Sequence, residues 1–194
     1  MFDPRPVTLE GFGVRLEPMT PAHAPDLLEA SRDRSIWTWY PLPPRPTLES
    51  VESMIRTALD ARDEGSQLPF VTRVGGEVVG STRYLDIRRP HRGLEIGWTW
   101  IRPEHQRTFV NTACKRLLLA HAFEDLGAIR VQLRTDNRNE RSKAAILRLG
   151  ATFEGTLRHH VITHDGTYRT TAGFSILDSE WPDVRDRLDG FLNR

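Results

Sequence analysis

Glu95 is the side chain whose type and surroundings best suit proton transfer. It opens a predicted strand in which its neighbours, Leu94 and Ile96, are apolar. Partial burial at such a place raises the pKa of a carboxyl group, and a carboxylate with a raised pKa is an effective general base near neutral pH. Glu95 is therefore a candidate base. A structural ion pair is the competing interpretation of the same residue.

A second chemical signal lies between Gly97 and Lys115, where a predicted strand runs into a predicted helix. The first turn of a helix presents backbone N–H groups without intrahelical partners, together with the positive end of the helix dipole. The connecting loop adds two arginines and several hydrogen-bonding side chains, namely Arg102, Gln106, Arg107, Thr108, Asn111 and Thr112. These groups favour a ligand that bears phosphate, and an ordinary capped helix is the alternative interpretation.

The strands that position these groups follow from the period of the apolar residues. Alternation of apolar and polar residues predicts strands, and Gly75-Gly76 and Pro90–Gly93 predict the turns of two hairpins. A third turn is predicted at Asp165-Gly166. The predicted strands cover residues 14–17, 70–74, 77–79, 81–88, 94–101, 129–134, 152–163 and 168–176.

Capping residues and apolar stripes at helical spacing predict the helices. The clearest stripe has apolar residues at positions 51, 54, 55, 58 and 59. Asn137 followed by Glu140 matches a capping box, and Gly150 suits the left-handed position that ends a helix. The helices are predicted to begin after Thr20, Thr47, Asn111, Asn137 and Ser179.

Length and composition indicate one globular domain. The chain has 194 residues, of which 38% are apolar and 27% charged, and this mixture differs from that of disordered and fibrous proteins. We therefore expect a single domain over residues 1–194. No apolar run approaches the roughly 20 residues needed to cross a bilayer, and residues 1–11 lack the features of a secretory signal. These observations predict a cytoplasmic protein without a membrane partner.

Charge and cysteine content narrow the class of function. The 27 basic and 26 acidic residues are nearly balanced, which argues against a surface designed for a polyanion, so a nucleic-acid-binding module is the weakest hypothesis. Only Lys115 and Lys143 are lysines, so arginine carries most of the positive charge. The single cysteine, Cys114, cannot form an internal disulfide, and we expect it to be a small buried apolar residue.

The order of these elements and four short motifs resemble the GNAT acetyltransferases, in particular the branch of ribosomal-protein N-terminal acetyltransferases. The resemblance extends from Val14 to Trp181. Its motifs are Glu95-Ile-Gly, Arg102-Pro103-Glu104-His105-Gln106, Asn139-Glu-Arg-Ser142 and Ser175-Ile-Leu-Asp-Ser-Glu-Trp181. The resemblance implies an α/β fold with a splayed, mostly antiparallel mixed sheet flanked by helices.

The same resemblance implies a site for acetyl-CoA. The pantetheine arm is expected beside the strand that ends at Ile101, with Asn139 in contact with it or ordering the adjacent loop. The pyrophosphate is expected over Gln106, Arg107, Thr108, Phe109, Val110, Asn111 and Thr112. Phe109 and Asn111 occupy two positions at which the family usually has small residues, so a phosphate approaches the backbone less easily there.

The resemblance also implies roles in acetyl transfer. Glu95 corresponds to a glutamate that often removes the proton from the attacking amine. Asn139, Ser142 and Ile146 share one face of a helix. Many relatives have a tyrosine at the place of Ile146 that protonates the leaving coenzyme A thiolate, and isoleucine cannot do so. Ser142 is then the hydroxyl that remains for this step.

Acceptor binding is assigned to aromatic residues and one histidine. Relatives shape the acceptor pocket with the loop that here holds Trp37, Trp39 and Tyr40, although a hydrophobic latch is the alternative for this loop. Ribosomal-type relatives place an acidic residue in the strand that here contains His159 and His160. Adjacent strand residues point to opposite faces, so at most one of these histidines faces the site, and His160 is chosen. No metal site is expected.

These observations predict an N-acetyltransferase that moves an acetyl group from acetyl-CoA to a primary amine, with a protein N-terminus as the acceptor that the resemblance favours. Free amino acids, polyamines and aminoglycosides are competing acceptors. The alternative is a non-catalytic protein of the same fold that binds an acyl-CoA or another ligand, an interpretation favoured by Phe109, Asn111 and Ile146. The sequence does not indicate an oligomeric state, and it is compatible with a dimer. Trp98 and Trp100 are interpreted as sheet packing.

Overall fold

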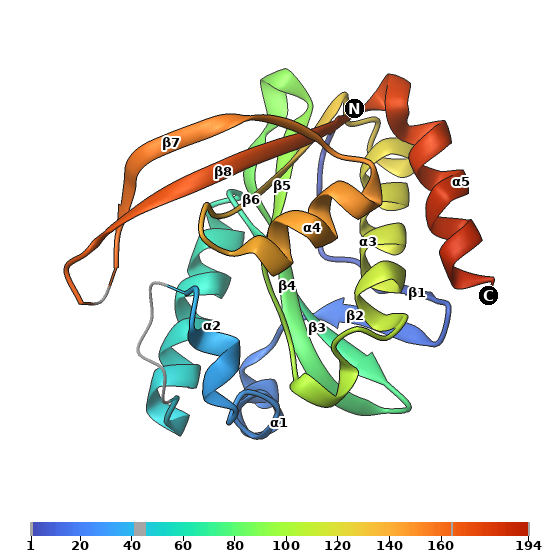
Figure 1. The fold of residues 1–194 in the computed structure, drawn as a ribbon. Coiled ribbons are helices and arrows are strands. Elements are labelled where there is room, and N and C mark those ends of the chain that lie inside the picture. The colour runs from blue at the N-terminus through green and yellow to red at the C-terminus, as the bar shows by residue number, and fades with distance from the viewer. Residues whose placement is uncertain (1, 41–45, 164, 194) are drawn as a thin grey trace.

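One mixed sheet organises the chain. The computed structural model describes residues 2–40, 46–163 and 165–193, which form eight strands in the order β1-β2-β3-β4-β5-β6-β8-β7 (Figure 1). All neighbours are antiparallel except β5 and β6, which are parallel. The strands are β1 Leu9–Gly11, β2 Val14–Pro18, β3 Leu68–Val74, β4 Glu77–Arg88, β5 Gly93–Ile101, β6 Arg130–Asp136, β7 Thr152–Ile162 and β8 Tyr168–Leu177. The expected splayed, mostly antiparallel sheet is confirmed.

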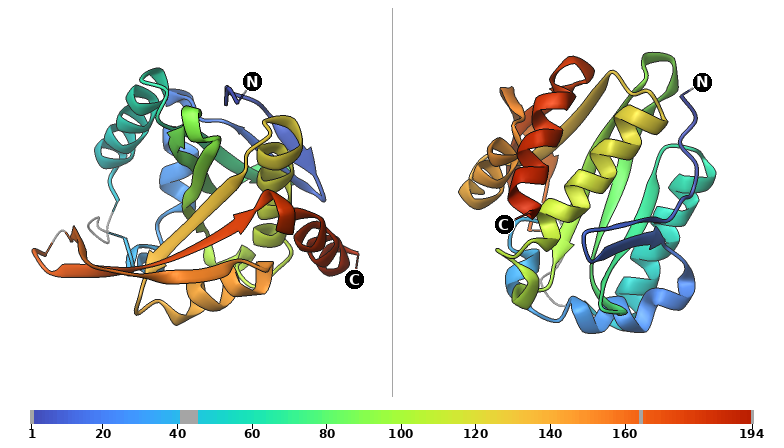
Figure 2. Two further views of the ribbon diagram at one scale, coloured as in Figure 1. Left: turned by 90° about the horizontal axis from the view of Figure 1, so that it is seen from above. Right: turned by 90° about the vertical axis from the view of Figure 1, so that its right-hand side faces the viewer.

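Helices cover both faces of this sheet. The helices are α1 Ala24–Ala30, α2 Leu48–Asp63, α3 Val110–Ala120, α4 Glu140–Leu149 and α5 Trp181–Leu192. Buried residues of α1 and α2 belong to one apolar cluster, and those of α3, α4 and α5 belong to another. Figure 2 shows α3 and α5 side by side, with strands between them and α2. The two clusters lie on opposite faces and hold the sheet between them.

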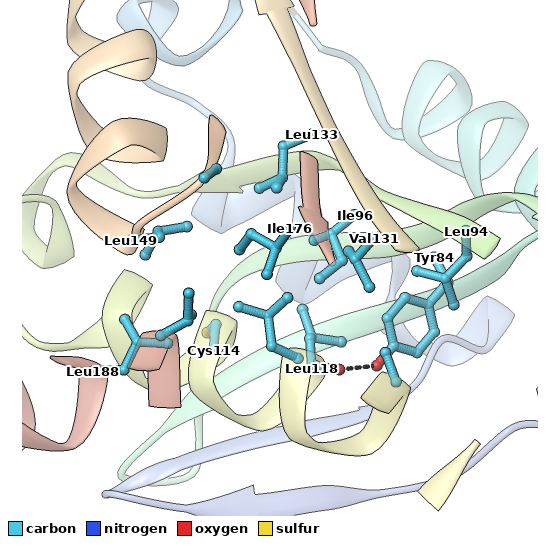
Figure 3. Close-up of a cluster of buried hydrophobic side chains, with 14 of the residues drawn as sticks. Tyr84, Leu94, Ile96, Cys114, Leu118, Val131, Leu133, Leu149, Ile176 and Leu188 are labelled. Carbon is cyan, nitrogen blue, oxygen red and sulfur yellow. Dashed lines mark hydrogen bonds between the residues drawn. The ribbon is translucent and has the colours of Figure 1, made fainter. Parts of the chain in front are cut away.

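The larger cluster anchors α3 against the sheet. Leu118 is fully buried beside Tyr84 of β4, whose hydroxyl donates a hydrogen bond to the Leu118 carbonyl (Figure 3). Cys114 is 1% exposed in the same cluster, and burial raises the pKa of its thiol to about 11. The expectation of a buried, unreactive Cys114 is confirmed. The register of α3 is thus fixed by apolar side chains, which sets the direction of its polar residues.

The parallel pair β5 and β6 separates soon after it forms. Its paired residues are Gly93 to Glu95 on β5 and Arg130 to Gln132 on β6. On the other edge of β5, the register against β4 shifts between Ser81 and Arg83. This shift places Trp98 and Thr99 of β5 opposite one residue of β4, the arrangement of a β-bulge, and Trp98 has a left-handed φ of 50°. Beyond Glu95, β5 therefore bends away from β6.

Several predicted helix ends are confirmed. The side chain of Thr47 accepts a hydrogen bond from the Ser50 N–H at the start of α2. Gly150 ends α4 with φ 108°, the left-handed conformation that glycine adopts without strain. The helix expected over residues 112–126 begins at Val110 and continues beyond α3 as a π-helical turn, His121–Asp125.

Three capping assignments were wrong. Thr20 precedes a short 3-10 turn, Pro21–His23, and α1 has His23 at its N-cap instead. Asn139 is the N-cap of α4 instead of Asn137, and its side chain accepts a hydrogen bond from the Ser142 N–H. The last helix has Glu180 at its N-cap instead of Ser179, because a short 3-10 turn, Asp178–Glu180, precedes it. Strand β1 was also not predicted, since three residues give too short a pattern to recognise.

Within the described ranges, none of the helices combines the length and the apolar character needed to cross a lipid bilayer.

Candidate active site

A cavity of about 490 Å³ opens where β5 and β6 separate. Four strands, two helices and the segment before α2 contribute to its wall, together with Leu85 of β4. Its lining includes Trp39, Tyr40, Glu95, Ile96, Gly97, Trp98, Thr99, Asn111, Lys115, Leu133, Arg134, Thr135, Asp136, Asn139, Ser142, Ala145, Ile146, Leu149, His160, Val161, Arg169 and Thr171. Residues far apart in the sequence are thereby gathered around one space.

Glu95 lies in this wall with 6% of its surface exposed. Burial raises the pKa of its carboxyl group, and the neighbouring Arg134 guanidinium offsets part of that shift. Arg134 Nε donates to Glu95 Oε2 at 2.5 Å, and Arg134 also lies 3.4 Å from Asp86. The expected rise in pKa is therefore confirmed, and the ion pair that was the competing interpretation is present as well. The two are compatible, because the second carboxylate oxygen is free of that bond.

Trp98 is a cavity residue that sequence reasoning missed. Its alternation with Trp100 predicted sheet packing for both, which is correct for the buried Trp100 and wrong for Trp98. The bulge breaks the alternation, so Trp98 turns into the cavity wall. There its ring packs on Tyr40, with centroids 5.6 Å apart, and the Arg83 guanidinium lies 4.6 Å from it. These contacts place two aromatic rings and one guanidinium side by side at the cavity wall.

Helix α4 contributes the face that was predicted from its spacing. Asn139, Ser142 and Ile146 all line the cavity. The Asn139 side chain is committed to capping, since its Oδ1 accepts from the Ser142 N–H at 3.0 Å. The Ser142 hydroxyl is the side-chain O–H group that α4 offers to the cavity, and Ile146 is buried beside it.

The loop before α3 is ordered by its own side chains. Gln106 Nε2 donates to the Ile101 carbonyl at 2.7 Å, and Gln106 Oε1 accepts from Arg141 at 2.8 Å. Arg107 has a left-handed φ of 59°, and Thr108 donates to the His105 carbonyl at 2.7 Å. The chain thus makes a sharp turn here without glycine. Helix α3 starts immediately after it, and its first N–H, that of Val110, donates to Thr108 Oγ1 at 3.3 Å. The next N–H groups of the first turn have no intrahelical partner and lie beside this loop.

Of the remaining residues predicted to bind the cofactor, only Asn111 lines the cavity. Val110 is buried in the larger apolar cluster. Thr112 is buried and accepts a hydrogen bond from Arg148 at 2.6 Å, so its hydroxyl is engaged by α4. Phe109 is 46% exposed and does not line the cavity. Its ring lies beside Gly13, where an added Cβ would contact it at 3.5 Å.

Two of the three residues predicted to bind the acceptor lie at the cavity. The Tyr40 hydroxyl donates to the Thr99 carbonyl at 2.7 Å, which ties the segment before α2 to β5. Trp37 does not line the cavity, because it is buried beneath Tyr40 and its Nε1 donates to the Ser31 carbonyl at 2.8 Å. Trp39, which is half-buried like Tyr40, lines the cavity instead. Residues 41–45, in the proline-rich continuation, lie outside the described residues.

His160 lines the cavity, and its Nδ1 lies 3.1 Å from the Thr171 hydroxyl. Desolvation lowers the pKa of its imidazole, and the charges of Arg134 and Arg169 lower it further, which favours the neutral ring. His159 packs on Tyr168, with ring centroids 4.7 Å apart, and is not part of the cavity wall. Of the two histidines, His160 is therefore the one that faces the cavity, as predicted.

Lys115 is a second cavity residue that was not predicted. It is 5% exposed, and its Nζ donates to Thr99 Oγ1 at 2.8 Å. Among the described residues no carboxylate lies within ion-pair distance of it, and burial lowers the pKa of its amine to about 8. A lysine on a helix normally indicates solvent exposure, and the available signal was the apolar stretch around it. No group of His, Cys, Asp and Glu residues suited to a metal ion occurs in residues 2–40, 46–163 and 165–193.

Comparisons with known proteins agree with this architecture. The sequence profile of the acetyltransferase (GNAT) domain matches residues 14–152. A GCN5-related N-acetyltransferase from Brucella melitensis is 30% identical, with a TM-score of 0.90 over 98% of this chain and 87% of that one. RimJ of Mycobacterium smegmatis, solved in complex with CoA-disulfide, is 23% identical, with a TM-score of 0.83 over 95% of this chain and 94% of that one, and shows the same fold.

A curated relative is similar over a shorter segment. YdaF of Bacillus subtilis (strain 168), a provisionally named ribosomal N-acetyltransferase, is 31% identical over 106 residues. The matched segment covers 55% of this chain and 57% of the relative, little more than half of its length. The profile match and the Brucella structure both cover most of this chain, and the fold they describe is the one observed. The chain belongs to the GNAT acetyltransferase family.

Proposed function

We propose that this protein transfers an acetyl group from acetyl-CoA to a primary amine in the cavity between β5 and β6. The family uses acetyl-CoA as its donor. The observation that carries the proposal is the position of Glu95, a buried carboxylate with a raised pKa in the wall of a cavity that also holds Ser142. A base and a hydroxyl around one space are what transfer from a thioester to an amine requires.

The residues around the cavity fit the donor. Beyond Glu95 the edge of β5 is not paired with β6, so the strand is open there to an extended pantetheine arm. The Thr99 and Ile101 carbonyls already accept hydrogen bonds from Tyr40 and Gln106. Asn111 and Asn139 supply polar groups beside this edge. The turn at Arg107 and the first N–H groups of α3 supply donors for the pyrophosphate. Arg107 and Thr108 are exposed and accessible to it.

Acetyl transfer then proceeds within a ternary complex. The amine nitrogen attacks the thioester carbon, and Glu95 accepts the proton that the nitrogen loses. The tetrahedral intermediate collapses with cleavage of the carbon–sulfur bond, whose electron pair leaves on sulfur. Ser142 donates its hydroxyl proton to this thiolate and regains a proton from solvent. His160, which lines the same cavity and whose pKa is lowered by desolvation, is a second group that suits proton transfer.

The acceptor that we propose is the N-terminal amine of a protein. This proposal rests on the similarity to YdaF, whose name describes a ribosomal N-acetyltransferase. Tyr40, Trp39 and Trp98 at the cavity provide rigid aromatic surfaces for a peptide. The position of Phe109 removes one argument for a non-catalytic protein, because its ring packs towards Gly13 and leaves the cavity open.

Calorimetric titration with acetyl-CoA, followed by a free-thiol release assay over a panel of amines, tests this function. The panel contains N-terminal peptides, free amino acids, a polyamine and an aminoglycoside. We expect stoichiometric binding of acetyl-CoA and thiol release that depends on the added amine, largest with peptides. Binding without thiol release from every amine would favour the non-catalytic alternative, and absence of binding would remove both.

A further inference from the structure

Arg169 of β8 is a cavity residue whose charge has no direct partner. Its Nε is buried and makes no hydrogen bond. Neither of its terminal nitrogens forms an ion pair or hydrogen bond with any residue in the described ranges. A buried N–H donor without a hydrogen bond is costly, because its desolvation is not repaid by a partner. Arg169 thus brings a partly buried guanidinium, with its Nε–H unpaired, to the cavity wall.

The acidic groups around Arg169 are already bonded to other arginines. Glu95 accepts from Arg134, and Asp136 accepts from Arg138 at 2.9 Å. The charges of Asp136 and Glu95 act on Arg169 from a distance and favour its protonated form, whereas burial lowers its pKa. Arg169 is therefore a cation that neither acid of the cavity neutralises through a direct contact.

A guanidinium is shaped to bind a carboxylate with two parallel hydrogen bonds. Tyr40, Trp98 and Glu95 lie around the same cavity, where the amine of the acceptor must enter to reach the base. An acceptor that carries a carboxylate near its amine would satisfy Arg169 and leave Glu95 free for the amine.

We infer that Arg169 selects acceptors that carry a carboxylate close to the reacting amine. This inference rests on the proposed acetyl transfer and adds a substrate class to it. The carboxylate has two chemical sources, the acidic side chain of a residue near a peptide N-terminus and the α-carboxylate of a free amino acid. Arg169 binds the acceptor and takes no part in the proton transfers.

Two matched pairs of acceptors separate these sources. One pair consists of peptides that differ only by Glu or Gln at the second position, and the other of a free amino acid and its amide. In the wild type we expect kcat/KM for the acidic member of one pair to exceed that of its neutral partner by on the order of tenfold. The pair that shows the preference identifies the source of the carboxylate.

Arg169→Gln should abolish this preference, so that the two members of each pair react with equal kcat/KM. Arg169→Lys keeps the positive charge but lacks the planar guanidinium, so it should retain only part of the preference for the acidic acceptor. Arg158→Gln is the matched control, because Arg158 lies on β7 outside this cavity and should keep the full preference. Calorimetric titration of the same acceptors reports the preference without turnover.

Equal kcat/KM and equal affinity within both pairs in the wild type would overturn the inference and leave acetyl transfer intact. A preference that persists in Arg169→Gln would also overturn it. If no acceptor releases thiol but the acidic members bind more tightly only when Arg169 is present, the proposed function fails and the carboxylate site stands.

Discussion

Glu95 carries the chemical step at the scale of the single residue. We expect Glu95→Gln to lower kcat by on the order of 100-fold, because a positioned general base contributes about that much, and to leave the affinity for acetyl-CoA unchanged. Steady-state kinetics together with calorimetric titration measure the two effects separately. Glu154→Gln is a suitable control, since Glu154 is paired with Arg130 and does not line the cavity.

The pH dependence of kcat gives a second test of the same residue. Burial raises the pKa of Glu95, so acidification should protonate the base and reduce kcat at a higher pH than for an ordinary carboxylate. Glu95→Gln should lack this acidic limb. In the folded state Glu95 also binds its proton more tightly than in the unfolded state, so its contribution to stability falls as pH rises through this range. Identical pH profiles for the two proteins would exclude Glu95 as the base.

Lys115 provides a prediction about stability. Burial lowers the pKa of its amine from 10.5 to about 8, so the unfolded state binds more protons between these values and the free energy of unfolding rises with pH across that window. Lys115→Met should be more stable than the wild type at pH 7, by an amount that shrinks by on the order of 2–3 kcal/mol as pH approaches 10.5. Urea unfolding at several pH values measures the difference. Lys143→Met, which removes an ion pair with Glu140 on α4, should show no such trend.

At the scale of elements, α4 depends on its N-cap. Asn139→Ala should lower the free energy of unfolding by about 1 kcal/mol, because the first turn loses the hydrogen bond from the Ser142 N–H. Asn139→Asp retains the cap and should preserve stability in urea unfolding. If Asn139 also contacts the pantetheine arm through its amide, both variants should weaken acetyl-CoA binding. Loss of affinity in the alanine variant alone would assign Asn139 to capping only.

Most elements could be predicted from the sequence because their signals are local. The hairpin at Gly75-Gly76 and the helix after Thr47 depend on neighbouring residues, and both were correct. The separation of β5 from β6 depends on contacts between distant segments, so the cavity itself was not predictable from periodicity. The bulge at Trp98 shifted that residue from the expected face.

The candidate site was predicted only in part for the same reason. Glu95, Ser142, Asn139 and Asn111 were named from motifs and lie around one cavity, whereas Trp37 was placed there and is buried in the core. Lys115, Trp98, Arg134 and Arg169 were missed. The apolar residues around Lys115 were the one available signal, because the sequence around a strand residue such as Arg134 or Arg169 does not distinguish a cavity wall from a solvated face.

At the scale of the whole molecule, the donor should stabilise the fold through the elements that it joins. The cavity is lined by β5, β6, α3 and α4, so a ligand bound there restrains both halves of the sheet. Acetyl-CoA at 100 times its Kd should raise the free energy of unfolding by about 2.7 kcal/mol, which corresponds to an increase in Tm of roughly 5–10 °C for a chain of this size. Thermal unfolding with and without the donor measures this shift. Glu95→Gln should show the same increase in Tm as the wild type. An unchanged Tm of the wild type in the presence of acetyl-CoA would contradict the proposed donor site.

A crystal structure of the protein with coenzyme A bound tests the central claim most directly. We predict that the pantetheine arm lies along β5 in the gap beside β6, with its pyrophosphate over residues 106–112 and its thiol between Glu95 and Ser142. Coenzyme A bound elsewhere on the surface, or a Phe109 ring turned into the gap with no ligand density beside β5, would contradict it.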